Sequence, residues 1–352
     1  MILWLTAHAT PQFTPVLNRL YNDEGLPLFA YYLWEGSGIR GWGEMDLQHP
    51  HTFHSAQGFL KDLRTGYLLA RAPSLQAAVV FGYSKPVAMG LLFGCRRHGI
   101  QVFTQSDTDY DQQRNKPLLR RTLKAIALRV LYARSTRVWV IGESNARFWQ
   151  AHGLINQRHI PFESPVPVPI APVDAGFKSK TSSDTALVLY VGRLSPEKRV
   201  ADAIFAVQML RDKGVKVTLR LVGAGTLPLR LPDRYRDWLQ ICGAVPHDEL
   251  ARHYIEADVL VLPSESEPYG LVIREALQFG LPVVASTVVP AAKELCNVGW
   301  NLVPPRDPAA LAVALKRAID LPARWASRPP VDTAALYHEE LSGLGRERSV
   351  AE

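Results

Sequence analysis

The second half of the chain alternates short β-branched runs with stretches of helical periodicity. Strands are expected at residues 186–191, 215–222, 238–242, 258–262, 282–285 and 300–303. Helices are expected at residues 197–213, 246–256, 270–279 and 307–320. This alternation is typical of βαβ units, so it predicts a mostly parallel sheet with helices on both faces.

The first half shows the same alternation less regularly. Strands are expected at residues 2–6, 28–33, 77–82, 101–104 and 138–141, and helices at 14–24, 84–97, 117–134 and 143–152. We therefore predict an α/β fold of two Rossmann-like domains that face each other across a cleft. The boundaries are an N-terminal domain at 1–163, a proline-rich and then Ser/Thr-rich linker at 164–184, a second domain at 185–322, and a tail at 323–352 that can cross back to the first domain.

Composition excludes several classes of protein. With 47% hydrophobic and 21% charged residues, the chain has the composition of an ordinary soluble protein, and no apolar run approaches the ~20 residues that cross a bilayer. The N-terminus, MILWLTAHATP, indicates a buried first strand and not a signal peptide. Three distant cysteines without a CxxC pair argue against a cysteine-built metal site. We expect a cytoplasmic protein.

The excess of positive charge lies in the first half. Residues 1–180 carry a net charge of +8, and residues 181–352 carry −1. Eight basic and no acidic residues lie from Arg114 to Arg137. This stretch contains the predicted helix at 117–134, whose apolar positions 119, 123, 126, 127, 130 and 131 are spaced for one buried stripe. Two interpretations stand: a core-packed helix with a solvated basic face, or a helix attracted to an anionic membrane surface. Nucleic acid is a poorer partner, because no aromatic-rich platform accompanies the basic run.

The segment SESEPYGLVIREAL, which begins at Ser264, carries the strongest chemical signal. It places Glu267 on a loop after a strand and Glu275 about a turn and a half into the following helix. Backbone N–H groups at a helix start attract phosphate, and Gly270 permits close approach to the backbone. The alternative is that both glutamates are solvated surface residues.

A second signal is the turn that follows the strand at 186–191. Arg193 and Lys198 bracket this turn, which contains a good N-cap in Ser195, and together they can bind the two phosphates of a diphosphate. Alternatively they form an ordinary solvated pair that Glu197 partly neutralises. Gly223 and Gly225 after the next strand do not complete a dinucleotide fingerprint, so they indicate a tight turn near a nucleotide or a plain structural turn.

Five motifs follow one another over residues 186–320: GRLSPEK, LVGAG, ICGAV, DVLVLPSESEPYGLVIREAL and GLPVVAS. Together they resemble the donor-binding domain of the family 4 glycosyltransferases, which are retaining enzymes of the GT-B fold. The resemblance implies that Arg193 and Lys198 hold the donor diphosphate, that Glu267 contacts the transferred sugar, and that Glu275 contacts the ribose. It also implies a donor-binding set of Gly192, Gly225, Ala244, Val245, Pro268, Tyr269, Gly270, Leu271 and Val272, with no bound metal and no cofactor.

The first half departs from this family pattern. The loop after the first strand, TAHATPQFTP, has His8 and Thr10 where many members have glycines, and the place of an acceptor-facing histidine is taken by Ser106, Asp107 or Asp109. Asp107 can orient an acceptor hydroxyl, or it can simply cap the loop before the basic helix. His49, His51 and His54 are interpreted as loop residues and not as a metal site.

These observations favour a retaining glycosyltransferase that moves a sugar from a nucleotide-sugar to a glycan, a lipid-linked acceptor or a small molecule. The alternative is a non-catalytic nucleotide-sugar-binding protein that docks on anionic membrane through its basic first half. A dehydrogenase is disfavoured by the incomplete glycine fingerprint.

Overall fold

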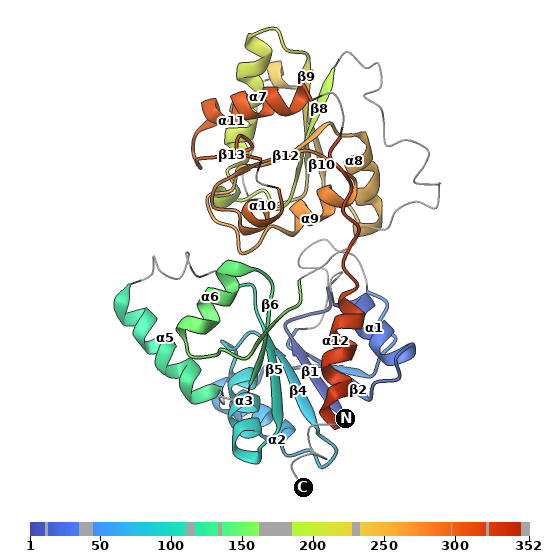
Figure 1. The fold of residues 1–352 in the computed structure, drawn as a ribbon, viewed down its shortest axis with the longest axis vertical. Coiled ribbons are helices and arrows are strands. Elements are labelled where there is room, and N and C mark those ends of the chain that lie inside the picture. Colours follow the sequence, from blue (N-terminus) through green and yellow to red (C-terminus); the bar gives the residue numbers. More distant parts are fainter. Residues whose placement is uncertain are drawn as a thin grey trace. The chain divides into compact units, whose positions relative to one another are not determined.

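The chain folds into two compact units, each described here by itself (Figure 1). The computed structural model describes residues 1–10, 13–34, 45–108, 110, 117–132, 136–161, 185–226, 233–296, 298–321 and 324–345. Unit 1 comprises Met1–Arg40, Glu44–Phe162 and Val331–Glu352, and unit 2 comprises Gly41–Gly43 and Glu163–Pro330. The predicted linker at 164–184 lies outside the described residues.

Unit 1 is built on a parallel sheet of seven strands in the order β3-β2-β1-β4-β5-β6-β7. The strands are β1 (Ile2–Thr6), β2 (Leu28–Tyr32), β3 (His51–Phe53), β4 (Ala77–Phe81), β5 (Gln101–Gln105), β6 (Arg137–Val140) and β7 (Gln157–His159). The helices are α1 (Thr14–Asn22), α2 (Phe59–Leu69), α3 (Pro86–His98), α5 (Leu118–Leu131), α6 (Glu143–Ala151) and α12 (Thr333–Ser342). Sequence periodicity did not predict β3, β7, α2 or α12.

Unit 2 repeats this arrangement with six parallel strands in the order β10-β9-β8-β11-β12-β13. The strands are β8 (Ala186–Val191), β9 (Val217–Val222), β10 (Leu239–Gly243), β11 (Val259–Leu262), β12 (Val283–Ser286) and β13 (Leu302–Val303). The helices are α7 (Val200–Asp212), α8 (Leu250–Glu256), α9 (Leu271–Gln278), α10 (Pro290–Leu295) and α11 (Pro308–Ile319).

The predicted α/β class is therefore confirmed, with a Rossmann-like sheet in each unit. In both sheets the first strand lies between the second and the fourth, so the chain reverses its direction of winding there. Ligands of open α/β sheets bind beyond the carboxyl ends of the strands at this switch point. In unit 2 it lies between β8 and β11.

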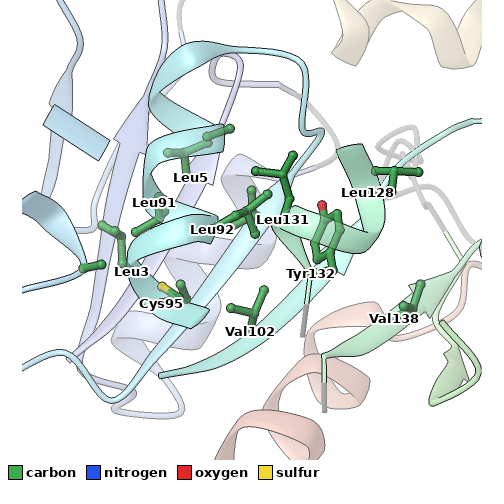
Figure 2. Packing of buried hydrophobic residues seen from close by; sticks show 14 of the residues in the cluster. Leu3, Leu5, Leu91, Leu92, Cys95, Val102, Leu128, Leu131, Tyr132 and Val138 are labelled. Carbon is green, nitrogen blue, oxygen red and sulfur yellow. The ribbon is translucent and has the colours of Figure 1, made fainter. Parts of the chain in front are cut away.

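Strand β1 is buried on both faces and separates the two cores of unit 1. Ile2 and Trp4 contribute to one core, whereas Leu3 and Leu5 contribute to the other. Successive side chains of a strand point to opposite faces, so a fully apolar strand serves both. Figure 2 shows the second core, in which Leu3 and Leu5 lie among side chains of α3 and the end of α5.

Helix α5 contradicts the prediction that its apolar stripe is buried. Leu119, Leu123, Ile126 and Val130 are each more than half exposed, and only Leu131 of the predicted stripe is buried. The helix instead packs through Leu128 and Leu131, followed by Tyr132, against the core of α3 and β5 (Figure 2). The helix has apolar residues on two faces, and the sheet covers the one that carries Leu128.

Helix α12, from near the end of the chain, packs on unit 1 beside α1 (Figure 1). Its Tyr337 hydroxyl donates a hydrogen bond to Gln105 Oε1 at 2.5 Å. Its buried Glu340 carboxylate accepts hydrogen bonds from Arg158 at 2.7 Å and from the indole of Trp139 at 3.2 Å. A buried carboxylate needs such partners, so these contacts fix α12 against β5, β6 and β7.

The three histidines between β2 and α2 support the fold and are not simple loop residues. His51 begins β3, and the buried His49 contacts the Tyr32 hydroxyl at 2.9 Å and Asn18 Oδ1 at 2.7 Å. His54 Nε2 lies 3.1 Å from Asp62 of α2. Burial lowers the pKa of His49 to about 4, so this imidazole is neutral at pH 7.

The Glu340 contacts predict how firmly α12 is held. Glu340→Gln keeps the shape of the side chain and removes its charge, so we expect the free energy that holds α12 on unit 1 to fall by about 1–3 kcal/mol. Hydrogen exchange of the α12 amides should then be roughly ten- to a hundredfold faster, because 1.4 kcal/mol corresponds to about a factor of ten. The matched control is Glu339→Gln, whose exposed carboxylate pairs with Arg158, and it should change exchange little. Equal effects of the two variants would contradict this assignment.

Candidate functional site

The turn after β8 buries a lysine. The predicted helix at 197–213 is split into a 3₁₀ turn at Pro196–Lys198 and α7, with Arg199 between them in the left-handed conformation at φ 52°. Arg199 donates two hydrogen bonds to the Asp202 carboxylate, at 2.8 and 2.9 Å, which stabilises this bend. As a result Lys198 lies inside unit 2 with 8% of its surface exposed.

Lys198 forms a buried ion pair with Glu267 from the loop after β11. Its ammonium Nζ lies 2.5 Å from Glu267 Oε2, to which Ser264 Oγ also donates at 3.3 Å. The two loops are joined by a backbone hydrogen bond from Glu265 N to Glu197 O at 2.9 Å. The interpretation of Lys198 and Glu267 as solvated surface groups is therefore wrong.

Arg193, the other cation of the predicted pair, has a different environment. Its exposed guanidinium lies 3.6 Å from Glu197 Oε1, which also accepts a 2.6 Å hydrogen bond from Ser195 Oγ. The Ser195 hydrogen bond and the nearby Arg193 and Lys198 charges lower the pKa of Glu197. Because a guanidinium has five N–H donors, Arg193 can contact an anion while it stays near Glu197.

Helix α9 begins at Gly270 beside this ion pair. Gly270 has φ 100°, and a Cβ built there would lie 2.7 Å from Val289 Cγ1, so conformation and space both require glycine. Among the described residues no side chain caps the helix. The first amide groups of α9 and the Lys198 ammonium thus both lie at the carboxyl end of the β8–β11 pair, where an anion is favoured.

Glu275 lies inside unit 2 and accepts a hydrogen bond from a residue that sequence reasoning missed. The Tyr254 hydroxyl donates to Glu275 Oε2 at 2.5 Å, and the Tyr254 ring stacks on Phe279 with centroids 5.5 Å apart. Burial and the neighbouring Glu275 charge raise the pKa of Tyr254 well above its usual value, so the hydroxyl remains a donor. Glu275 has only 7% of its surface exposed, which rules out a solvated position.

The two glycines after β9 allow the neighbouring loops to touch. A Cβ at Gly223 would lie 1.9 Å from the Gly192 carbonyl oxygen, and one at Gly225 would lie 2.1 Å from that of Leu194. Leu194 N donates to Ala224 O at 3.0 Å across this contact. Close packing of two loops accounts for both glycines.

Every donor-binding residue predicted in unit 2 follows β8, β9, β10 or β11. Because these strands are parallel neighbours, their carboxyl ends lie along one edge of the sheet. Ala244 and Gly225 are exposed, Val245, Leu271 and Val272 are half-buried, and Tyr269 is buried. Pro268 is exposed beside Glu267.

Unit 1 carries a separate cluster at the carboxyl ends of its strands. His8 follows β1, and its ring lies 6.1 Å from the ring of Trp34, which follows β2. The Lys85 ammonium, at the start of α3, lies 4.4 Å from the centre of the Trp34 ring. Sequence reasoning identified His8 and missed Trp34 and Lys85. The signal available in the sequence was a tryptophan directly after the predicted strand at 28–33, and the structure shows that this side chain is exposed.

The remaining candidates of unit 1 have other surroundings. Thr10 is buried, and its hydroxyl and carbonyl oxygens accept hydrogen bonds from the first amides of the α1 region. Asp107 is exposed after β5, in a loop that Asn145 holds by donating to the Ser106 and Thr108 carbonyls at 2.9 and 2.8 Å. Asp109 lies outside the described residues. In the part of the chain that the structure describes, no three His, Cys, Asp or Glu residues are grouped to hold a metal ion.

Sequence comparison with known proteins matches part of the second half of the chain to a family model. Residues 185–320 match the family model described as "Glycosyl transferases group 1". Glycogen synthase of Mycobacterium tuberculosis H37Rv is 39% identical over 144 residues, which cover 39% of this chain and 35% of that protein. D-inositol 3-phosphate glycosyltransferase of Kineococcus radiotolerans is 33% identical over 165 residues, 40% of this chain and 38% of that one. These matches span little more than a third of each relative.

Solved structures match both units. The match to sucrose-phosphate synthase from Thermosynechococcus elongatus covers 100% of this chain and 99% of that chain, with a TM-score of 0.71 and 19% identity. Anabaena HepE in complex with UDP and glucose covers 99% of this chain and 98% of its own, with a TM-score of 0.66 and 15% identity. The chain has the GT-B fold. Its second unit also shares the sequence pattern of the glycosyltransferase family model.

The hydrogen bond between Tyr254 and Glu275 predicts a measurable energetic coupling between these two residues of unit 2. Tyr254→Phe removes one hydrogen-bond donor from the buried Glu275 carboxylate, so we expect a loss of about 1–3 kcal/mol in urea unfolding. A double-mutant cycle with Glu275→Gln should give a non-zero coupling energy. Tyr235→Phe, at another buried tyrosine of unit 2, is the control. Additive effects of Tyr254→Phe and Glu275→Gln would contradict the contact.

Proposed function

We propose that the protein is a retaining glycosyltransferase that uses a nucleotide-sugar donor. The observation that carries the proposal is the buried Lys198–Glu267 pair beside the start of α9, at the switch point of the second sheet. A cation, a helix start and a carboxylate together suit a ligand that has both a phosphate and a hydroxylated sugar. The match of residues 185–320 to a glycosyltransferase family and the UDP bound in HepE support it.

In this proposal the donor diphosphate binds Lys198 and the first amides of α9. An ammonium has three N–H donors, so Lys198 can keep Glu267 as one partner and still bind phosphate. The Arg193 guanidinium, which has five N–H donors, binds the second phosphate. Glu275 contacts the ribose, and the base lies along Gly225, Ala244 and Val245.

The reaction breaks the bond between the anomeric carbon and the phosphate oxygen, and the electron pair stays on the leaving diphosphate. The acceptor hydroxyl attacks the same face of the sugar, which retains the configuration, and its proton passes to a leaving phosphate oxygen. Lys198, Arg193 and the α9 amides stabilise the charge that develops on the diphosphate. Glu267, held by Lys198 and Ser264, orients the sugar hydroxyls. These groups supply the positive charge without a metal ion.

The acceptor half of the proposal rests on unit 1. Aromatic rings commonly line ligand sites, and Trp34 is exposed at a sheet edge beside His8 and Lys85. We assign this cluster to the acceptor, which is a glycan, a lipid-linked glycan or a small molecule. Asp107, at the end of β5 in the same sheet, is available to orient the attacking hydroxyl.

A thermal-shift screen against UDP-, GDP-, ADP- and TDP-sugars identifies the donor, because a ligand that binds only the folded protein raises its stability. The donor found is then incubated with p-nitrophenyl α- and β-hexosides, and NMR of the product gives the anomeric configuration. An inverted product would exclude the retaining reaction. If the donor binds but is neither transferred nor slowly hydrolysed, the result would favour a non-catalytic nucleotide-sugar-binding protein.

Lys198→Met tests the diphosphate contact. We expect turnover to fall about a hundredfold or more, as removal of one charge-stabilising group commonly does, and nucleotide diphosphate to bind more weakly. Lys213→Met, at an exposed lysine after α7, should leave both unchanged. Because Glu267 loses its partner, Lys198→Met is first checked for folding by circular dichroism. Wild-type turnover in the folded variant would exclude the assignment.

Trp34→Ala tests the acceptor assignment. We expect the KM for the hexoside acceptor to rise roughly tenfold while the KM for the donor stays constant, since the ring lies on the unit assigned to the acceptor and about 1.4 kcal/mol of lost contact is a factor of ten. Trp34→Phe should restore most of the acceptor affinity. An unchanged acceptor KM, or an equal change in the donor KM, would contradict the assignment.

A further inference from the structure

Helix α5 of unit 1 presents an apolar row to solvent. Leu119, Leu123, Ile126 and Val130 are spaced by four, three and four residues, so they lie on one face, and each is more than half exposed. Leu118, 73% exposed, extends the apolar surface at the start of the helix. Contiguous exposed apolar surface of this kind marks an interaction site.

This apolar row does not arise from a poorly packed helix. The opposite face carries the buried Leu128 and Leu131, which belong to the core shown in Figure 2. The Arg96 guanidinium from α3 donates to the carbonyl oxygens of Arg129 and Val130, at 2.8 and 2.7 Å, and so caps the last turn. The helix is therefore held from within while its outer row faces solvent.

The charges of α5 have a single sign. Residues 118–131 include Arg120, Arg121, Lys124 and Arg129 and contain no acidic residue. Two copies of this face would bring these cations together, which disfavours self-association. An apolar row flanked by cations fits a surface that is apolar inside and anionic outside.

A cavity of about 260 Å³ lies between α5 and α6, and none of the four residues of the apolar row lines it. Its lining includes Leu118, Arg121, Lys124 and Phe148. The Lys124 ammonium lies 4.7 Å from the centre of the Phe148 ring, and burial lowers the pKa of Lys124 to about 8, so the group still carries its charge at pH 7. Because Arg121 and Lys124 precede the buried Leu128 by seven and four residues, the cavity and its two cations lie on the covered side of α5, away from the apolar row.

We propose that α5 docks unit 1 on a bilayer that contains anionic phospholipid, with Leu119, Leu123, Ile126 and Val130 among the acyl chains and with Arg120 and Arg129, which flank the row, at the lipid phosphates. The helix lies in the plane of the interface. Among the described residues, no helix has the length and hydropathy to span a membrane. This inference concerns unit 1 by itself and does not depend on sugar transfer.

The test is co-sedimentation of the full chain with vesicles of phosphatidylcholine alone or with 30% phosphatidylglycerol. We expect binding that requires the anionic lipid and weakens as salt rises, because exposed charges are screened over about 8 Å at physiological ionic strength. Absence of binding, or equal binding to both vesicles, would overturn the proposal.

Two variants separate the apolar and the charged contributions. Leu119→Ser with Leu123→Ser, and separately Arg120→Glu with Arg129→Glu, should each weaken binding to anionic vesicles at least tenfold, while circular dichroism and the thermal midpoint stay near wild type. The matched controls are on α2 of the same unit or directly after it: Phe59→Ser with Leu60→Ser at exposed apolar residues, and Arg64→Glu with Arg71→Glu at exposed arginines. Equal losses in the α2 controls would contradict a specific role for α5. If the variants do not fold, Leu123→Ser alone with the same vesicles decides the question.

Two further measurements distinguish other occupants of the surface. Glycerol 3-phosphate at millimolar concentration should not release the protein from vesicles; release would mean that the cations of α5 bind a small soluble phosphate instead of a membrane lipid. Sedimentation velocity without lipid should give one species whose mass is the same for wild type and Leu119→Ser with Leu123→Ser. A larger wild-type species that this variant dissociates would identify the row as a contact between copies of the chain and would overturn membrane docking.

Discussion

The candidate site depends on the parallel pairing of β8 with β11. This pairing places two loops that are 69 residues apart in sequence at one sheet edge, where the Lys198 ammonium and the Glu267 carboxylate form a buried pair. Neither charge is stable there alone, because a buried ion without a partner is costly. The left-handed Arg199 and the glycine at 270 then serve the same pair, one by turning Lys198 inward and the other by starting α9 beside it.

The sequence predicted the strands and helices whose periodicity is long or unambiguous. Each predicted strand of unit 2 lies within two residues of an observed one, and their parallel arrangement followed from the alternation of strands and helices. The strands β3 and β7 have three residues each, too few to show a period. Helix α2 has glycine in its middle because Gly66 touches the backbone of α3, where a Cβ would lie 1.9 Å from the Val87 carbonyl oxygen. Such contacts become visible only in the folded chain.

The same limit applied to the candidate site. Lys198 and Glu267 could be identified because each lies in a loop directly after a predicted strand, a position that sequence reveals. Tyr254 could not, since its hydroxyl meets Glu275 only after α8 and α9 pack on the sheet. Arg193 and Lys198 looked equivalent in the sequence, yet Arg193 is exposed and Lys198 is buried. The difference arises because the chain bends at Arg199, between Lys198 and the start of α7.

Helix α5 shows why amphipathic periodicity cannot by itself say which face is covered. Its sequence offers two apolar faces, one with Leu119 and Ile126 and one with Leu128 and Leu131, and only contact with α3 and the sheet decides between them. The covered face and the Arg96 contacts hold the helix, so the outer leucines and arginines contribute little to that packing. Exposed substitutions away from packing contacts usually change stability by less than about 0.5 kcal/mol. The outer row can therefore be altered without unfolding unit 1, and any loss of binding that follows belongs to the surface.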